Sequence, residues 1–208
     1  MDFLFNINVQ FYLAAYLIGA IPFGLLLARG FGGVDIRQYG SGSIGATNVL
    51  RVLKEQKPAL AKKLAVATLG LDAIKGAAVV LIAMAAGLDA HVQWSVAVLA
   101  VIGHCFSPFL KFEGGKGVAT GVGVLLVLLP FAALAGLAIW FAVGRWLKIS
   151  SVASLSGLLG AVAISFLFYP SLPGIGNHAP LLLIGFIIFY KHIPNLIGLF
   201  KGREARVV

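Results

Sequence analysis

The feature that most constrains this chain is a series of apolar stretches that recur along its whole length. The hydrocarbon core of a bilayer is about 30 Å thick, so a helix needs about 20 mostly apolar residues to cross it. Such spans are expected at residues 9–28, 64–88, 94–110, 152–168 and 181–200. Charged residues make up only 11% of the chain, against about 25% in a typical soluble domain. We therefore predict one all-α integral membrane domain over residues 1–208.

A further apolar stretch, residues 118–144, is interrupted by Pro130. Proline removes a backbone hydrogen bond from a helix, and a broken helix is tolerated in a membrane where the break is buried in protein. We expect two short crossings here, which gives about seven membrane segments in all, including short or broken helices. The alternative is one long tilted helix.

Basic residues predict the orientation, because Lys and Arg concentrate in cytoplasmic loops. Seven of the 16 basic residues lie in the segment 29–63, at Arg29, Arg37, Arg51, Lys54, Lys57, Lys62 and Lys63. The connections at residues 89–93 and 169–180 contain none and are expected outside. Two crossings within 118–144 place every other basic loop on the cytoplasmic side, whereas one crossing would put Arg145 and Lys148 outside. We expect an outward N-terminus, retained rather than cleaved, an inward C-terminus and residence in a bacterial cytoplasmic (inner) membrane.

The net charge of +9 would suggest nucleic acid as a partner of a soluble protein. Here the basic residues flank membrane spans, and the loops lack an aromatic-basic pattern, so no nucleic-acid partner is predicted. The one cysteine, Cys105, excludes an internal disulfide. No pair of acidic residues is spaced to hold Mg²⁺ and no Cys/His cluster suggests zinc, so we predict neither a metal nor a cofactor.

The first polar segment, residues 41–48, has the sequence SGSIGATN and is followed by Arg51. Glycine lets backbone N–H groups approach an anion, hydroxyls donate to phosphate oxygens, and arginine binds them with a bidentate fork. The candidate anion-binding residues are Ser41, Gly42, Gly45, Thr47, Asn48 and Arg51. The alternative is a flexible surface loop, but the Thr-Asn-x-x-Arg continuation indicates the start of a short interfacial helix.

The second polar segment places Lys116 in a glycine-rich turn, with Gly114 and Gly115, just before an apolar helix. A helix N-terminus carries partial positive charge, so this turn is a candidate anion site. It is not a Walker A loop, because residue 110 is Leu and Gly117 follows the lysine, and an ATP site is disfavoured. The alternative for Lys116 is a cation that sets topology. For His104, earlier in the segment, a helix-capping or helix-linking role is favoured.

The third polar segment is KHIPN, residues 191–195, in the last span. His192 and Asn195 lie three residues apart and share one face if the helix continues past Pro194. Ionisable groups at this depth usually face a cavity or a partner. The alternative is a pair of hydrogen bonds that pack helices.

Two weaker signals complete the polar set. Asp72 and Lys75 are spaced to form an ion pair inside the second span, where an unpaired charge is costly. Ser150 and Ser151 stand at an expected helix start, as N-caps or as donors to phosphate.

These segments resemble the signature motifs of a known family. Residues 41–51, 103–120 and 191–195 are similar to the three motifs of the bacterial acyl-phosphate:glycerol-3-phosphate acyltransferases, the PlsY family; residues 71–76 and the Ser150–Ser151 pair also fit. The departures are small: Ser43-Ile44 stands where Asn-Pro is common, and Lys191 where Arg is common. The resemblance covers nearly the full chain in order and spacing.

The resemblance implies transfer of a fatty acyl group from acyl phosphate to the sn-1 hydroxyl of glycerol 3-phosphate, giving lysophosphatidic acid and inorganic phosphate. We expect acyl phosphate to bind Ser41, Gly42, Gly45, Thr47, Asn48, Gly114, Gly115 and Lys116. We expect glycerol 3-phosphate to bind Arg51, Lys116, Ser150, Ser151, His192 and Asn195. Lys116, Arg51, His192 and Asn195 are the candidate catalytic residues. Membrane lipids are expected partners, and the acyl-phosphate-producing enzyme is a further candidate.

Two other functional classes stay open on the residues alone. Broken helices with charges inside the membrane also suit a small anion or phosphate transporter. A non-catalytic membrane scaffold gives no reason for Lys116 and Arg51 to accompany glycine-rich loops.

Overall fold

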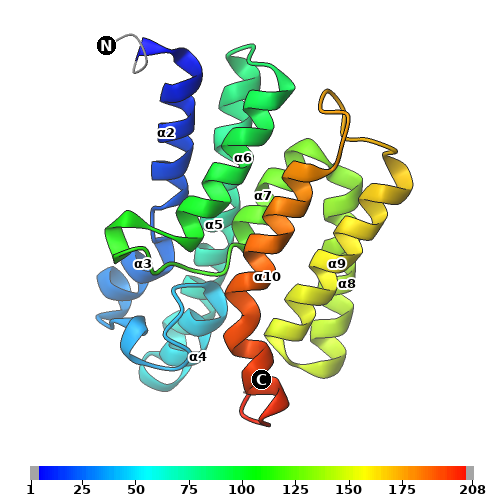
Figure 1. Cartoon of the computed structure of the whole chain (residues 1–208). Helices are drawn as coiled ribbons and strands as arrows, with labels where there is room; N and C mark the ends of the chain where they lie inside the picture. The colour runs from blue at the N-terminus through cyan, green and yellow to red at the C-terminus, as the bar shows by residue number, and fades with distance from the viewer. Residues whose placement is uncertain (1–4, 205–208) are drawn as a thin grey trace.

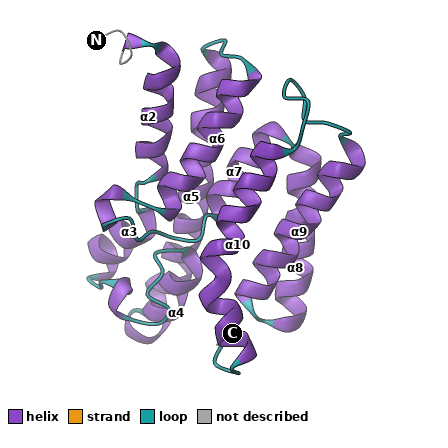
Figure 2. Ribbon diagram, viewed as in Figure 1, coloured by secondary structure: helices purple, strands orange, loops and turns teal. Residues whose placement is uncertain are grey.

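The computed structural model describes residues 5–204, in which all regular structure is helical (Figures 1 and 2). The α-helices are α2 (Ile7–Gly19), α3 (Phe23–Gly32), α4 (Ala46–Gln56), α5 (Pro58–Ala85), α6 (Ala90–Cys105), α7 (Val118–Leu128), α8 (Pro130–Leu147), α9 (Ser150–Phe168) and α10 (Ala179–Phe200). Two short 3₁₀ turns, η1 (Ile36–Gln38) and η2 (Pro108–Leu110), lie in connections. Residues 1–4 and 205–208 lie outside the described residues. They belong to the N-terminus predicted to face outward and to the C-terminal tail predicted to face inward.

Six helical segments are long and apolar enough to cross a membrane, and the apolar helix Val118–Leu128 is shorter. The predicted all-helical membrane fold is therefore confirmed. Helix α2 begins at one end of the bundle, and α10 finishes at the opposite end (Figure 1). The end of the bundle at which α10 finishes also carries α4 and the turn between α8 and α9.

Residues 118–144 form two helices, so the single-helix alternative is wrong. Helix α7 stops at Leu128 and α8 begins at Pro130. Leu129 between them leaves the helical region, with φ −140° and ψ 66°. Proline disfavours helical geometry in the residue before it, which explains why the break falls here.

Several helix boundaries differ from the predicted ones. Helix α5 begins at Pro58 rather than at residue 64, and proline is well suited to the first position of a helix. Helix α6 begins at Ala90 rather than at residue 94, since the Asp89 side chain accepts a hydrogen bond from the Val92 N–H at 3.0 Å. The predicted span at residues 9–28 is two helices, α2 and α3, separated at Pro22.

Glycines allow the helices that surround the site to pack backbone to backbone. A methyl group on Gly123 of α7 would collide with the Ala73 carbonyl oxygen of α5. Gly136 of α8 and Gly157 of α9 face each other in the same way, since a methyl group on either would lie less than 3 Å from the carbonyl oxygen of the other. These contacts make one closely packed pair of α5 with α7 and another of α8 with α9.

Candidate active site

A cavity of about 460 Å³ lies between these two helix pairs, with α4 and α10 completing its wall. Its polar end is lined by Ser41, Gly45, Thr47, Asn48, Arg51, Lys116, Ser150, Ser151, His192, Asn195 and Glu204. The rest of the lining is mostly apolar and comes chiefly from α5, α7, α8 and α9, with Ser43, Asp72 and His104 among its polar residues. The cavity thus has one cationic and hydroxyl-rich end, which continues into an apolar part.

Most of the predicted site residues converge on this cavity although they are far apart in the chain. The exceptions are Gly42, Gly114, Gly115 and Lys75 of the predicted ion pair, which do not line it. Gly42 and Gly40 have φ values of 69° and 61° and shape the loop before α4. Positive φ is readily adopted only by glycine, so Gly42 acts on the turn rather than on the cavity wall.

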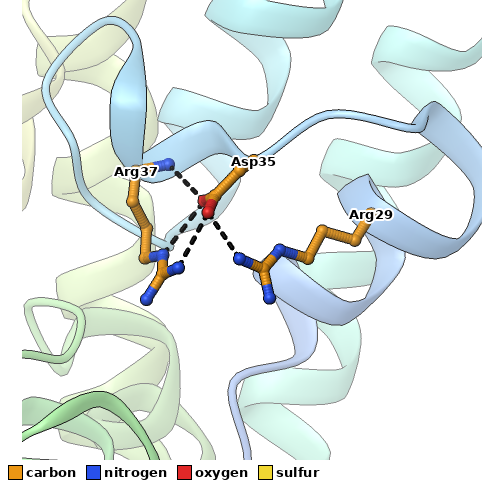
Figure 3. A network of polar contacts seen from close by, with 3 residues as sticks. All are labelled: Arg29, Asp35 and Arg37. Carbon is orange, nitrogen blue, oxygen red and sulfur yellow. Dashed lines mark hydrogen bonds and ion pairs between the residues drawn. The ribbon is translucent and has the colours of Figure 1, made fainter.

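The loop that carries Ser41 is fixed by a three-residue ionic cluster at its start (Figure 3). The Asp35 carboxylate accepts hydrogen bonds from the Arg37 side chain at 2.7 and 3.0 Å and from Arg29 at 2.5 Å. The Arg37 backbone N–H also donates to Asp35. These hydrogen bonds, those from Arg37 first, hold the pKa of Asp35 well below its usual range. The cluster joins the end of α3 to η1, and so anchors the segment leading to Ser41.

Asn48 fixes the rest of that loop. Its buried side-chain amide donates to the carbonyl oxygens of Ile36, Tyr39 and Ser43, at 2.9, 3.2 and 2.8 Å. Its side-chain oxygen accepts the Ser41 N–H at 2.9 Å. Because the amide is fully used in these bonds, Asn48 positions Ser41 and has no donor left for a phosphate.

Lys116 reaches the cavity from a loop that is strapped to the end of α6. The N–H groups of Gly114 and Gly115 donate to the carbonyl oxygens of Cys105 and His104, at 3.1 and 2.9 Å. A methyl group on Gly115 would strike the His104 ring, so the strap requires a glycine there. Burial lowers the pKa of Lys116, and the nearby Glu204 carboxylate opposes that shift. A partly desolvated ammonium binds an anion more strongly than a solvated one.

Beneath this strap lies a buried ionic group that links three helical segments. Lys75 and Asp72 form an ion pair at 2.7 Å, and each is at most 4% exposed. The Lys75 ammonium also lies 2.9 Å from His104 Nδ1 and donates to the Ile21 carbonyl oxygen at 2.8 Å. Since Ile21 stands at the break between α2 and α3, Lys75 satisfies a backbone group that the broken helix leaves free. His104 thereby links α6 to α5, the role favoured for it from the sequence.

The hydroxyl and amide residues at the polar end connect three elements. Thr47 Oγ1 and Ser150 Oγ are 3.0 Å apart and join α4 to α9. Ser151 Oγ and Asn195 Nδ2 both donate to one oxygen of Glu204, at 2.7 and 2.9 Å. Glu204 is not among the site residues that the sequence predicts. No sequence pattern marks it, because the chain reaches the cavity only by turning back after α10.

Helix α10 continues past Pro194 to Phe200, so His192 and Asn195 share the cavity face as expected. The Nδ1 atom of His192 lies 2.8 Å from the Ile188 carbonyl oxygen. A carbonyl oxygen can only accept, so Nδ1 carries the proton and Nε2 is the free ring nitrogen. His192 is 1% exposed, and packing holds the ring in this orientation.

Within residues 5–204, no group of three or more His, Cys, Asp or Glu side chains is placed to hold a metal ion. Besides the Glu204 carboxylate and the His192 ring, the polar end presents ammonium, guanidinium, hydroxyl and amide groups. Such a set is suited to binding phosphate oxygens and to stabilising negative charge as it develops.

Comparisons with known proteins agree with this chemistry. The family model described as glycerol-3-phosphate acyltransferase matches residues 9–202. The glycerol-3-phosphate acyltransferases of Wolinella succinogenes and Sulfurimonas denitrificans are 60% and 56% identical to this chain, over all of both chains.

Two solved structures share the fold. Both are crystal structures of PlsY (YgiH), an integral membrane glycerol 3-phosphate acyltransferase, in the glycerol 3-phosphate and lysophosphatidic acid forms. They are 36% identical to this chain, with TM-scores of 0.85 and 0.83; the first match covers 97% of this chain and 96% of the other, the second 96% and 94%. The chain belongs to the glycerol-3-phosphate acyltransferase family, the PlsY family.

Proposed function

We propose that this enzyme transfers a fatty acyl group from acyl phosphate to the sn-1 hydroxyl of glycerol 3-phosphate. The products are lysophosphatidic acid and inorganic phosphate. The observation that supports this most strongly is that Arg51 and Lys116 line one end of a cavity whose remaining part is mostly apolar. One reactant is a phosphate with a long acyl chain and the other is a small phosphate, so their reaction needs such a space. The family membership disfavours the transporter alternative.

The residues at the polar end divide between the two reactants. Ser41, the backbone at Gly45 and Lys116 hold the acyl-phosphate head group. Arg51 and Lys116 stand between the two phosphates. The glycerol 3-phosphate side is formed by Ser150, Ser151, His192 and Asn195. Asn48 and Glu204 act on this set through their hydrogen bonds to Ser41, Ser151 and Asn195.

The reaction is an acyl transfer without a covalent enzyme intermediate. The glycerol hydroxyl oxygen attacks the acyl carbonyl carbon, and the bond from that carbon to the phosphate oxygen breaks. Asn195 or backbone N–H groups stabilise the oxyanion formed on the carbonyl oxygen. The hydroxyl proton passes to the departing phosphate, whose second pKa of about 6 is taken by analogy with phosphoserine. No strong protein base is required.

His192 is the competing proton acceptor, because its Nε2 is the free ring nitrogen. If the phosphate takes the proton, His192→Ala should keep most of its kcat at saturating glycerol 3-phosphate while the KM for glycerol 3-phosphate rises. Steady-state kinetics of the purified variant measure both constants. A fall in kcat of about 10²-fold or more, with little change in KM, would instead assign the base role to His192.

The basic residues around the site support an orientation of the protein in its membrane. The polar end of the cavity is lined by residues of α4, the start of α9, the later part of α10 and Glu204. The neighbouring segments 29–63 and 145–148 carry nine of the 16 Lys and Arg residues. Lys- and Arg-rich ends face the cytoplasm, so the active site opens to the cytoplasm and the N-terminus lies outside. The acyl-phosphate-producing enzyme is the partner expected on that side.

The proposed function is tested with purified protein in detergent. Inorganic phosphate should be released from acyl phosphate only when glycerol 3-phosphate is present, with one lysophosphatidic acid formed per phosphate. Acyl-CoA should not replace acyl phosphate. Phosphate release that continues without glycerol 3-phosphate, or phosphate flux in liposomes without any product, would contradict the proposal.

A further inference from the structure

We propose that Leu125, Ala133 and Ala161 form the closed end of the acyl-chain channel and set the longest fatty chain that the enzyme accepts. This inference rests on the proposed function, because it requires that the acyl tail of the donor lies in the apolar part of the cavity. It goes beyond that function because it assigns the limit on chain length to particular side chains.

The direction of the channel follows from the helices that line it. Helices α7 and α9 both start at the polar end, near Lys116 and Ser150, whereas α8 runs back toward it. The lining residues most remote from that end are therefore the last of α7 and α9 and the first of α8. These are Leu125, Ala161 and Ala133. Along α9, Ser150 and Ala161 are separated by about 16 Å at 1.5 Å per residue.

The channel is closed beyond these three residues. Leu129 is fully buried at the junction of α7 and α8, and Ala132 beside it is also fully buried. Neither residue lines the cavity. The chain turns back at Pro130, next to these residues. Because α7 is short, the α7–α8 junction closes the channel at a point where a longer helix would have continued alongside it.

Small side chains leave room for the acyl tail at the closed end of the channel. Ala133 and Ala161 are 3% and 5% exposed, so a larger side chain at either position has to occupy the channel or displace its neighbours. The side chain of Ala161 already packs closely on Gly136, where an added methyl group would lie 2.9 Å from the Ala161 Cβ. The near side differs: Val66 and Leu69 of α5 line the cavity and are 61% and 43% exposed. The tail therefore enters from the lipid beside α5, and its terminal methyl reaches the Ala133–Ala161 wall.

The test uses a series of saturated acyl phosphates graded by two carbons, with kcat/KM for each as the readout. Ala133→Val should lower the ratio of long-chain to short-chain kcat/KM by roughly 10-fold or more, because a single methylene in a tight pocket is worth about that factor. Leu125→Ala should move the optimum in the opposite direction, toward longer chains. Ala132→Val is the matched control, since it overpacks the same turn of α8 outside the channel and should leave the ratio unchanged.

The outcomes separate the possible failures. If both Ala133→Val and Leu125→Ala keep the wild-type chain-length profile, the assignment of the closed end is wrong. If Ala132→Val, which does not line the channel, shifts the profile as much as Ala133→Val does, the effect comes from overpacking of α8 and the assignment of Ala133 to the closed end is wrong. Should Ala133→Val fail to fold, the direction of the Leu125→Ala shift decides. A wild-type enzyme inactive with every acyl phosphate would contradict the proposed function itself.

Discussion

Replacement of Lys116 by alanine is expected to lower kcat/KM by about 10³-fold, the loss seen when one main stabilising donor is removed from an active site. Lys116 lines the cavity from a loop that Gly114 and Gly115 bind to the end of α6, so the backbone that carries its side chain is held in place before the substrates bind. It stands where both phosphates would meet, and its charge is partly desolvated. Its removal leaves two anions side by side with Arg51 as their main counter-charge.

The measurement is the steady-state rate of phosphate release by the purified variant, together with its thermal unfolding in detergent. Lys111→Ala is the matched control, because Lys111 is an exposed lysine of the same connection that does not line the cavity. The control should keep wild-type activity, and both variants should keep wild-type stability. Normal turnover by Lys116→Ala would remove Lys116 from the phosphate site.

Asp72→Ala should reduce the free energy of unfolding by about 3–5 kcal/mol, the cost of removing one partner of a buried ion pair. The Lys75 ammonium would then lie buried beside the His104 ring, the Ile21 carbonyl oxygen and the Phe23 ring. None of these groups carries the negative charge that compensated it. Lys75 donates to the free backbone carbonyl at the break between α2 and α3, and His104 accepts a hydrogen bond from the loop that carries Lys116. The loss of Asp72 should therefore destabilise both the α2–α3 break and this loop.

Denaturant unfolding of the detergent-solubilised variant, followed by circular dichroism, tests this expectation. Asp72→Ala combined with Lys75→Met should recover most of the lost stability, because the double change removes the uncompensated charge. Asp35→Ala provides the contrast, since the arginines that pair with Asp35 are 41% and 51% exposed and such pairs contribute about 1 kcal/mol or less. Equal losses for Asp35→Ala and Asp72→Ala would contradict the buried-pair account.

The elements that the sequence predicts well are those with a single physical cause. Pro130 predicts the break between α7 and α8, because proline acts on its own backbone and on the residue before it. The spacing of Asp72 and Lys75 predicts an ion pair, since a lone charge inside a span is expensive. The membrane spans follow from hydrophobic length, and two of them start earlier than predicted, at Pro58 and after the N-cap residue Asp89.

The parts that the sequence cannot predict depend on distant segments meeting. Asn48 resembles a phosphate ligand because its residue type suits that role, but its amide is used by carbonyl groups of the preceding loop. Gly114 and Gly115 resemble an anion-binding turn, yet they dock on α6. Glu204 has no local signature at all, because its contacts with Ser151 and Asn195 arise only after α9 and α10 have packed.

The central claim is that Lys116 and Arg51 hold two phosphates next to each other at the polar end of one cavity. A structure of the enzyme with glycerol 3-phosphate and a non-hydrolysable acyl phosphonate bound together tests it most directly. Both phosphorus-bearing groups should lie within hydrogen-bond distance of Lys116 Nζ, with the acyl tail extending toward Ala133 and Ala161. Either group bound outside this cavity, or the two bound out of reach of Lys116, would contradict the account.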